Sequence, residues 1–384
     1  MTTRILLPTA AALLAAATAA PAAAQQAFAL RFDSTKVAVT RDVQYATADT
    51  VALRMDVVRP ADAGSRPLPT LVFLNRAFGS QQRGWNFYQN WAKAAAARGL
   101  TAIVPDIRGG SEVADARRLV AHLAAHGAEI GVDTAAIAVY AASSNAGYGF
   151  PFVEDPATTG VKAAVIYYGG SDIQQFRLDL PVLYVRAGLD RPDLNRFMVT
   201  LASRAVSQNA PLTFLNHPTG YHGFETLNDD DATREVMERT IAFVKHATSP
   251  GAQRALRAGM REATAAAHVS TGKFAEAAAV YRELVAERPE AHTLRLAYGE
   301  ALIGAQQYAL ACDELEKLRG KGLGPRDLGL PAARACAGKG DAERAVGWLM
   351  TIPARFLPAS AAEDPAFASI KDREEFKAVF RRTP

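Results

Sequence analysis

Residues 137–147, with the sequence IAVYAASSNAG, decide the fold of this chain. A run of apolar residues typical of a buried strand leads directly into serine among small residues, and a helix is expected to follow. A sharp turn from strand to helix forces its serine to a positive φ and exposes the hydroxyl. The crossing elements need small neighbours, which Ala141 and Ala146 supply, while Asn145 is of a type that tolerates unusual backbone angles. The alternative is a serine that simply caps a helix.

Strands and helices alternate through residues 37–247. The first two runs, 37–47 and 50–58, alternate apolar and polar residues and predict an antiparallel pair. The continuous apolar runs that follow predict strands buried on both faces; they are 71–75, 100–105, 136–140, 163–168, 182–186 and 212–215. Helical patterns separate them, including 83–98, 111–126 and 232–246. The fold class is therefore α/β, a mostly parallel sheet with helices on both faces.

Residues 131–139, GVDTAAIAV, together with the turn after them, resemble the approach to the nucleophile in the α/β-hydrolase family, particularly its dienelactone hydrolase and small-esterase branch. The resemblance implies that Ser143 is the nucleophile, and Ser144 is the competing candidate. The family pattern is G-x-S-x-G, whereas here Ala141 and Asn145 stand at the glycine positions. The family also implies a chain order of serine, acid and histidine.

Two later strands end in residues that suit the acid and the base. Run 182–186 is followed by Asp190. The resemblance to the α/β-hydrolase family implies that this carboxylate orients the histidine, and Asp193 is the alternative. Run 212–215 leads to a His-Gly-Phe sequence whose His222 would act as the general base, with His217 as the alternative. Because ligands in such sheets bind beyond the carboxyl ends of the strands, we expect these side chains to meet there.

An acyl-transfer site also needs two backbone N–H donors for the oxyanion. One is expected at Ser144, and the other at Arg76 or Ala77 in the loop after run 71–75, although the lipase-type HGGG is absent. The Arg76 side chain could instead bind a substrate carboxylate. No metal-ligand motif, GxGxxG or P-loop follows a strand, so we expect neither a metal nor a cofactor.

The N-terminus has the pattern of a processed signal peptide. Arg4 precedes an apolar, Ala-rich stretch, and Ala22-Ala23-Ala24 offers small residues for cleavage. We therefore assign 1–24 as a signal peptide and expect a periplasmic or secreted protein; an uncleaved anchor is the alternative. No later run is long enough to span a bilayer. The net charge of +4 over 384 residues, without a long basic run, argues against nucleic acid as a partner.

After residue 250 the pattern becomes helical. The segments 272–277, 306–311 and 340–345 align so that Ala277, Ala311 and Ala345 recur at a constant spacing, the period of tetratricopeptide repeats, which this region resembles. A periodic helical bundle outside that family is the alternative. We expect an α/β-hydrolase domain over 25–250 and this tetratricopeptide-like helical array over 251–384.

The array carries both cysteines and raises questions that the sequence leaves open. Cys312 and Cys336 are either a disulfide, which export permits, or two small core side chains. A short array could pack on the hydrolase, bind a protein or peptide, or mediate self-association.

The sequence thus predicts a secreted serine hydrolase that cleaves small-molecule carboxyl esters through Ser143, Asp190 and His222. Two alternatives remain. The same triad would serve a serine peptidase, and an inactive hydrolase fold could act as a binding module through its repeats.

Overall fold

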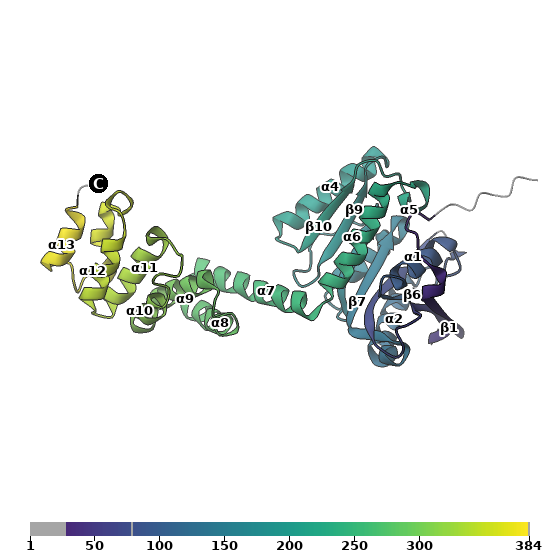
Figure 1. The fold of residues 1–384 in the computed structure, drawn as a ribbon, viewed down its shortest axis with the longest axis horizontal. Coiled ribbons are helices and arrows are strands. Elements are labelled where there is room, and N and C mark those ends of the chain that lie inside the picture. Colours follow the sequence, from purple (N-terminus) through teal and green to yellow (C-terminus); the bar gives the residue numbers. More distant parts are fainter. Residues whose placement is uncertain (1–27, 78–79, 383–384) are drawn as a thin grey trace, which may run out of the picture.

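The computed structural model describes residues 28–77 and 80–382. The segment 1–24, assigned above as a signal peptide, lies outside the described residues. A sheet covered by helices occupies the N-terminal part, and helices alone follow after it (Figure 1). Among the described residues no helix is both long and apolar enough to cross a membrane.

The strands of the main sheet are β1 Val37–Ala48, β2 Val51–Pro60, β3 Leu68–Leu74, β6 Thr101–Pro105, β7 Val132–Ala142, β8 Val161–Tyr167, β9 Val182–Ala187 and β10 Leu212–His217. A two-stranded ribbon comprises β4 Arg76–Ala77 and β5 Ser80–Gln81. The helices around the sheet are α1 Asn86–Ala96, α2 Glu112–His126, α3 Ala146–Glu154, α4 Pro192–Ser207, α5 Phe224–Leu227 and α6 Asp231–Ala247.

The eight strands lie in the order β1-β2-β6-β3-β7-β8-β9-β10. The β1–β2 and β2–β6 pairs are antiparallel, and every later pair is parallel. The predicted α/β class, with its mostly parallel sheet, is therefore confirmed. The parallel strands bring their carboxyl ends to one edge, which is where the loops after β3, β7, β9 and β10 meet.

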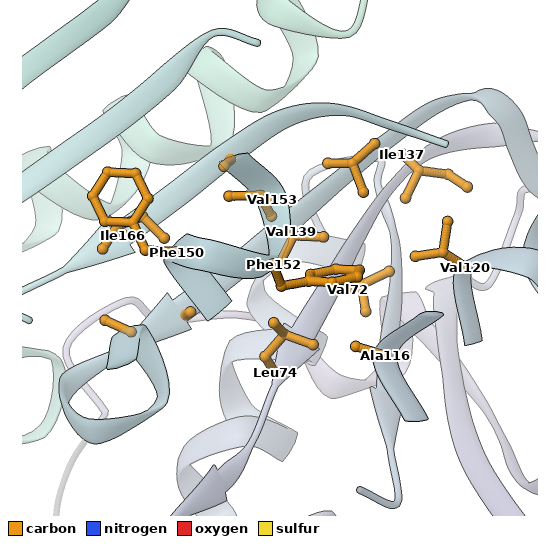
Figure 2. Packing of buried hydrophobic residues seen from close by; sticks show 14 of the residues in the cluster. Val72, Leu74, Ala116, Val120, Ile137, Val139, Phe150, Phe152, Val153 and Ile166 are labelled. Atoms are coloured by element: carbon orange, nitrogen blue, oxygen red, sulfur yellow. The ribbon is translucent and has the colours of Figure 1, made fainter. Parts of the chain in front are cut away.

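Both faces of the sheet are buried, which explains the continuous apolar runs. Successive residues of β3 point to opposite sides: Val72 packs toward α2 and α3, whereas Phe73 packs toward α1 and α6. Figure 2 shows the first of these cores, where Phe150 and Phe152 of α3 lie over the strands. Side chains on both faces of the central strands are thus removed from water, and helices hold these strands from both sides.

The C-terminal helices are α7 Pro250–Ser270, α8 Phe274–Glu287, α9 His292–Gly304, α10 Tyr308–Glu316, α11 Pro325–Gly338, α12 Ala342–Thr351 and α13 Glu374–Phe380. The three alanines that share one repeat position, Ala277, Ala311 and Ala345, are all fully buried, so the predicted helical array is present. Its assignment to the tetratricopeptide family stays a prediction. Cys312 of α10 and Cys336 of α11 form a disulfide, which resolves the alternative that the sequence left open.

Candidate active site

The turn between β7 and α3 has the geometry expected of a nucleophile elbow. Ser143 follows β7 directly and has a φ of +56°, a left-handed value that residues other than glycine seldom adopt. Asn145, whose residue type tolerates unusual backbone angles, has ordinary helical ones, so the positive φ of this turn lies at Ser143, as expected. The Asn145 amide group donates a hydrogen bond of 2.8 Å to the Tyr88 hydroxyl of α1, beneath the turn.

The turn lacks the two glycines of the family pattern, but glycines of the facing segments lie close to it. A Cβ at Gly149 of α3 would lie 2.6 Å from the Cβ of Ala141, so the helix crosses the strand too closely for a larger residue. A Cβ at Gly169, just after β8, would lie 2.4 Å from the backbone oxygen of Ser143. Alanine at position 141 is therefore compatible with the turn because its neighbours are small.

Three side chains from distant loops meet at the carboxyl edge of the sheet. The Ser143 Oγ lies 2.7 Å from His222 Nε2, and His222 Nδ1 lies 2.5 Å from Asp190 Oδ2. A carboxylate can only accept, so Nδ1 carries the proton and Nε2 is left to accept from the serine hydroxyl. The Asp190 side chain is only 4% exposed, and its second oxygen accepts from the Arg191 amide.

Two of the competing candidates have other partners. His217, at the end of β10, is fully buried; its Nε2 lies 2.7 Å from the Thr233 hydroxyl, and burial lowers the pKa of this imidazole. Asp193 is exposed on α4 and pairs with Arg191. Ser144 is exposed beside the turn, and the hydroxyl bonded to His222 is that of Ser143.

The candidate oxyanion donors lie around the same turn. The Arg76 amide donates a hydrogen bond of 3.2 Å to the Tyr148 hydroxyl of α3, which links the loop after β3 to the helix after the nucleophile. Ala77 pairs with Ser80 in the ribbon. The Arg76 guanidinium lies against Gly109, where a Cβ would be 2.4 Å from Nη2.

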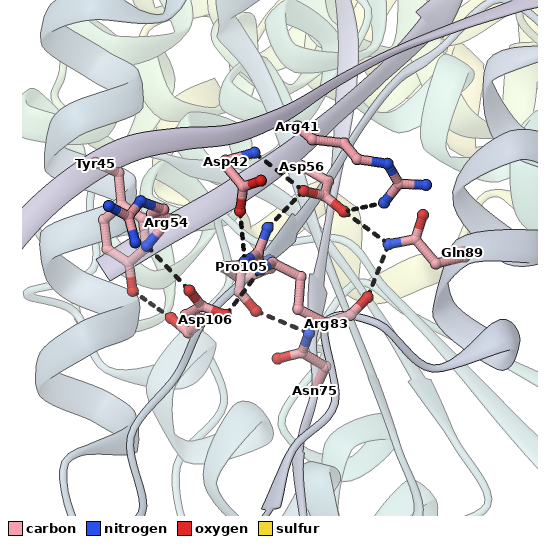
Figure 3. Close-up of polar contacts among 10 residues, drawn as sticks. All are labelled: Arg41, Asp42, Tyr45, Arg54, Asp56, Asn75, Arg83, Gln89, Pro105 and Asp106. Atoms are coloured by element: carbon pink, nitrogen blue, oxygen red, sulfur yellow. Dashed lines mark hydrogen bonds and ion pairs between the residues drawn. The ribbon is translucent and has the colours of Figure 1, made fainter. Parts of the chain in front are cut away.

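A partly buried ion-pair network holds the segment that follows this ribbon (Figure 3). Arg83 donates to Asp56 at 2.6 Å and to Asp42 and Asp106 at 2.8 Å each. Gln89 of α1 donates both to Asp56 and to the Arg83 carbonyl. The segment that follows the ribbon is thus fixed to the antiparallel end of the sheet.

Sequence reasoning missed a second polar cluster beside the histidine. The Tyr168 ring packs on the His222 ring at a centroid distance of 4.7 Å, and the Tyr168 hydroxyl donates to Glu225 at 2.8 Å. The available signals were weak: Tyr168 follows the end of a strand, and Glu225 follows the His-Gly-Phe sequence by one residue.

Nothing in the described part of the chain forms a metal-binding cluster of three or more histidine, cysteine or acidic side chains. The arrangement instead suits proton transfer between an oxygen nucleophile and an imidazole.

Several solved structures are similar to this one. They include a bacterial heroin esterase (13% identity, TM-score 0.46, covering 57% of this chain and 86% of that one). A thermostable esterase from Pseudomonas putida ECU1011 has 15% identity and a TM-score of 0.48 over 57% and 86% of the two chains. Brefeldin A esterase, described as a bacterial homologue of human hormone-sensitive lipase, has 14% identity and a TM-score of 0.48 over 57% and 78%.

No curated protein matches the chain. At the level of families, the Dienelactone hydrolase family matches residues 53–248, which is about half of the chain and includes the elbow, Asp190 and His222. The chain therefore belongs to the dienelactone hydrolase family and is an α/β-hydrolase.

Proposed function

We propose that the protein hydrolyses carboxyl esters of small molecules through an acyl-enzyme on Ser143. The observation that carries the proposal is the hydrogen-bonded relay from Ser143 through His222 to Asp190, built on a serine with a positive φ. A free serine hydroxyl is a weak nucleophile, and an adjacent imidazole that accepts its proton activates it.

In the first half-reaction, the Ser143 oxygen attacks the acyl carbon and His222 Nε2 takes the proton. The tetrahedral intermediate collapses when the bond to the leaving alkoxide breaks, and His222 returns the proton to that oxygen. In the second half-reaction, water attacks the acyl-enzyme with the same proton transfers, which releases the acid and restores the serine. Asp190 holds the imidazole in the required tautomer and stabilises its positive charge.

The developing oxyanion would be met by the Ser144 amide and by an amide of the loop at Arg76 or Ala77. The Arg76 amide donates to the Tyr148 hydroxyl, so its use as an oxyanion donor would require that hydroxyl to move or to share the amide. The Arg76 guanidinium remains a second candidate for contact with substrate, through a carboxylate.

A fluorophosphonate probe tests the proposal. Covalent labelling at Ser143, mapped by mass spectrometry, is expected in the wild type and absent in Ser143→Ala. Ser144→Ala is the matched control, because it removes the neighbouring hydroxyl and leaves the relay intact. Labelling at Ser144 would move the nucleophile by one residue, and no labelling of the folded wild type would favour the binding-module alternative.

Turnover of matched ester and amide substrates then separates esterase from peptidase, and we expect the ester to be preferred.

We also propose that residues 1–24 direct export to the periplasm or the outside. The Cys312–Cys336 disulfide supports an oxidising compartment. Expression with and without this segment, followed by N-terminal sequencing of the mature chain, tests the cleavage expected before Gln25.

A further inference from the structure

Glu225 is a carboxyl group buried completely inside the hydrolase fold. Its Oε1 accepts from the Tyr140 hydroxyl at 2.7 Å and from the Trp91 indole at 3.3 Å, and its Oε2 accepts from the Tyr168 hydroxyl at 2.8 Å. Burial raises the pKa of this carboxyl, and the three donors oppose that effect. A buried carboxyl is costly unless its oxygens are hydrogen-bonded, so these three donors are what holds the carboxyl of Glu225 in one place.

Tyr168 connects this carboxyl to the proposed active site. Its ring packs on the His222 ring, and its backbone has a φ of +29°, outside the regions that residues with a side chain prefer. The next residue, Gly169, approaches the backbone oxygen of Ser143 so closely that no Cβ would fit. A two-residue segment with a strained backbone therefore touches both the nucleophile and the general base.

Glu225 also lies on the histidine's own segment, shortly after His222 and within α5. The carboxyl thus joins two pieces of chain: the one that carries the imidazole and the one whose ring packs against it. The other carboxyl oxygen, Oε1, accepts from Trp91 of α1 and Tyr140 of β7, neither of which touches the imidazole. Rotation of the imidazole away from Ser143 would displace the Tyr168 ring against this anchored hydrogen bond.

We infer that Glu225 and Tyr168 form a positioning pair that holds His222 at hydrogen-bonding distance from Ser143. The inference rests on the proposed function. Both residues act by positioning His222. Neither residue touches the reacting atoms. A misplacement of a catalytic group by about 1 Å can cost roughly 100-fold in rate, so the pair should act mainly on kcat.

Two variants test the pair directly. Tyr168→Phe keeps the ring beside His222 but removes the hydroxyl that Glu225 binds, and Glu225→Gln keeps the size but replaces one carboxyl oxygen with a donating amide nitrogen. We expect kcat for an activated ester to fall roughly 10- to 100-fold in each, with KM changed by about threefold or less, because ground-state binding does not use the imidazole position.

Tyr140→Phe is the matched control. It also removes one hydroxyl from Glu225, but the Tyr140 ring packs on Phe73, Trp91 and Tyr167. We expect a similar loss of thermal stability with kcat within about threefold of the wild type. Equal loss of kcat in Tyr140→Phe and Tyr168→Phe would overturn the inference, as would variants that lose stability alone.

A spectroscopic measurement distinguishes failure of this inference from failure of the proposed function. The proton between His222 and Asp190 should give a low-field NMR resonance in the wild type, which Tyr168→Phe shifts or broadens and Tyr140→Phe leaves in place. If the wild type neither turns over esters nor reacts at Ser143, the proposed function fails, whereas this comparison still reports on imidazole positioning. An unchanged resonance in Tyr168→Phe would refute the pair.

Discussion

The sheet and the C-terminal helices reach a well-packed structure by opposite means. In the sheet, Ser143 and His222 are 79 residues apart and form a contact that occurs once. In the helical array one contact recurs: Phe274 packs on Gly304, and one repeat later Tyr308 packs on Gly338. In both, a Cβ on the glycine would lie within 2.4 Å of the ring.

This difference indicates which parts of the chain are free to carry catalytic residues. A repeated contact requires the same small and aromatic residues in every unit, so its positions are committed to packing. The loops at the carboxyl edge of a parallel sheet carry no such requirement, because the strands beneath them hold the fold. Changes at the relay should therefore reduce activity with little loss of structure, whereas changes within the array should reduce its stability with little loss of activity.

The largest expected effect is the difference in ester turnover between variants of two neighbouring histidines, His222 and His217. His222→Asn should lower kcat/KM for esters by roughly 10⁴-fold or more, because the serine loses its base. His217→Asn should leave turnover within about tenfold but destabilise the fold by about 1–3 kcal/mol, since it disturbs a buried hydrogen bond to Thr233. Ester kinetics and thermal unfolding of both variants measure this contrast. A folded His217→Asn without activity would contradict the assigned relay.

Sequence reasoning selected three residues that the structure brings into contact, because each of them follows a strand with a clear apolar run. Their supports were not readable in the same way. Glu225 is acidic and lies in a short polar segment, so its complete burial becomes apparent only when α1, β7 and the end of β8 close around it. The sequence allowed unusual backbone angles at Asn145, but the positive φ of the turn lies at Ser143, where the sharp turn predicted it.

For the array, the sequence predicted the positions of the helices but not the state of the cysteines. The repeat period placed the helices, since α8, α10 and α12 begin at the equivalent repeat positions Phe274, Tyr308 and Ala342. It did not decide the state of the cysteines, because their separation of 24 residues is compatible with either state. The disulfide forms because α10 and α11 pack side by side with both cysteines buried in the interface.

That disulfide gives the second prediction, which acts on the array alone. The double variant Cys312→Ser/Cys336→Ser should destabilise the array by roughly 3 kcal/mol, because closing a loop of this length restricts the unfolded chain. Ester turnover below the unfolding temperature should stay at the wild-type value. Calorimetry with parallel kinetics gives both quantities. If activity were lost together with the array, the two regions would be coupled more tightly than their contacts suggest.

The third prediction uses pH to destabilise the sheet region. Burial raises the pKa of Glu154 from its ordinary value of 4.5 to about 7, while its hydrogen bond from the Arg177 amide opposes that rise. Between about pH 4.5 and 7 the unfolded chain has lost this proton and the folded chain keeps it, so stability falls as pH rises. The loss amounts to about 3 kcal/mol above pH 7.

Glu154→Gln should remove this contribution, so that its stability relative to the wild type improves as pH rises from about 4.5 to 7 and is constant above. Urea unfolding at several pH values measures the difference. Glu129→Gln is the control, because that carboxyl is exposed on the same region of the chain. Parallel pH profiles for Glu154→Gln and the wild type would mean that the buried carboxyl titrates normally.

The smallest expected effect concerns the start of α7, where the chain passes from one region to the other. The Ser249 side chain accepts from the Ala252 amide and caps the helix, so Ser249→Ala should cost about 1 kcal/mol. Ser270→Ala at the other end of the same helix is the control, because that hydroxyl donates to a carbonyl and caps no amide.

The sheet region and the helical array are expected to unfold in separate transitions. The transition whose midpoint Ser249→Ala lowers then identifies the region to which α7 belongs. We expect the array transition to move, since α7 packs along α8. A shift confined to the sheet would place the boundary after α7, at Ser270 rather than near Pro250 where the sequence pattern changes.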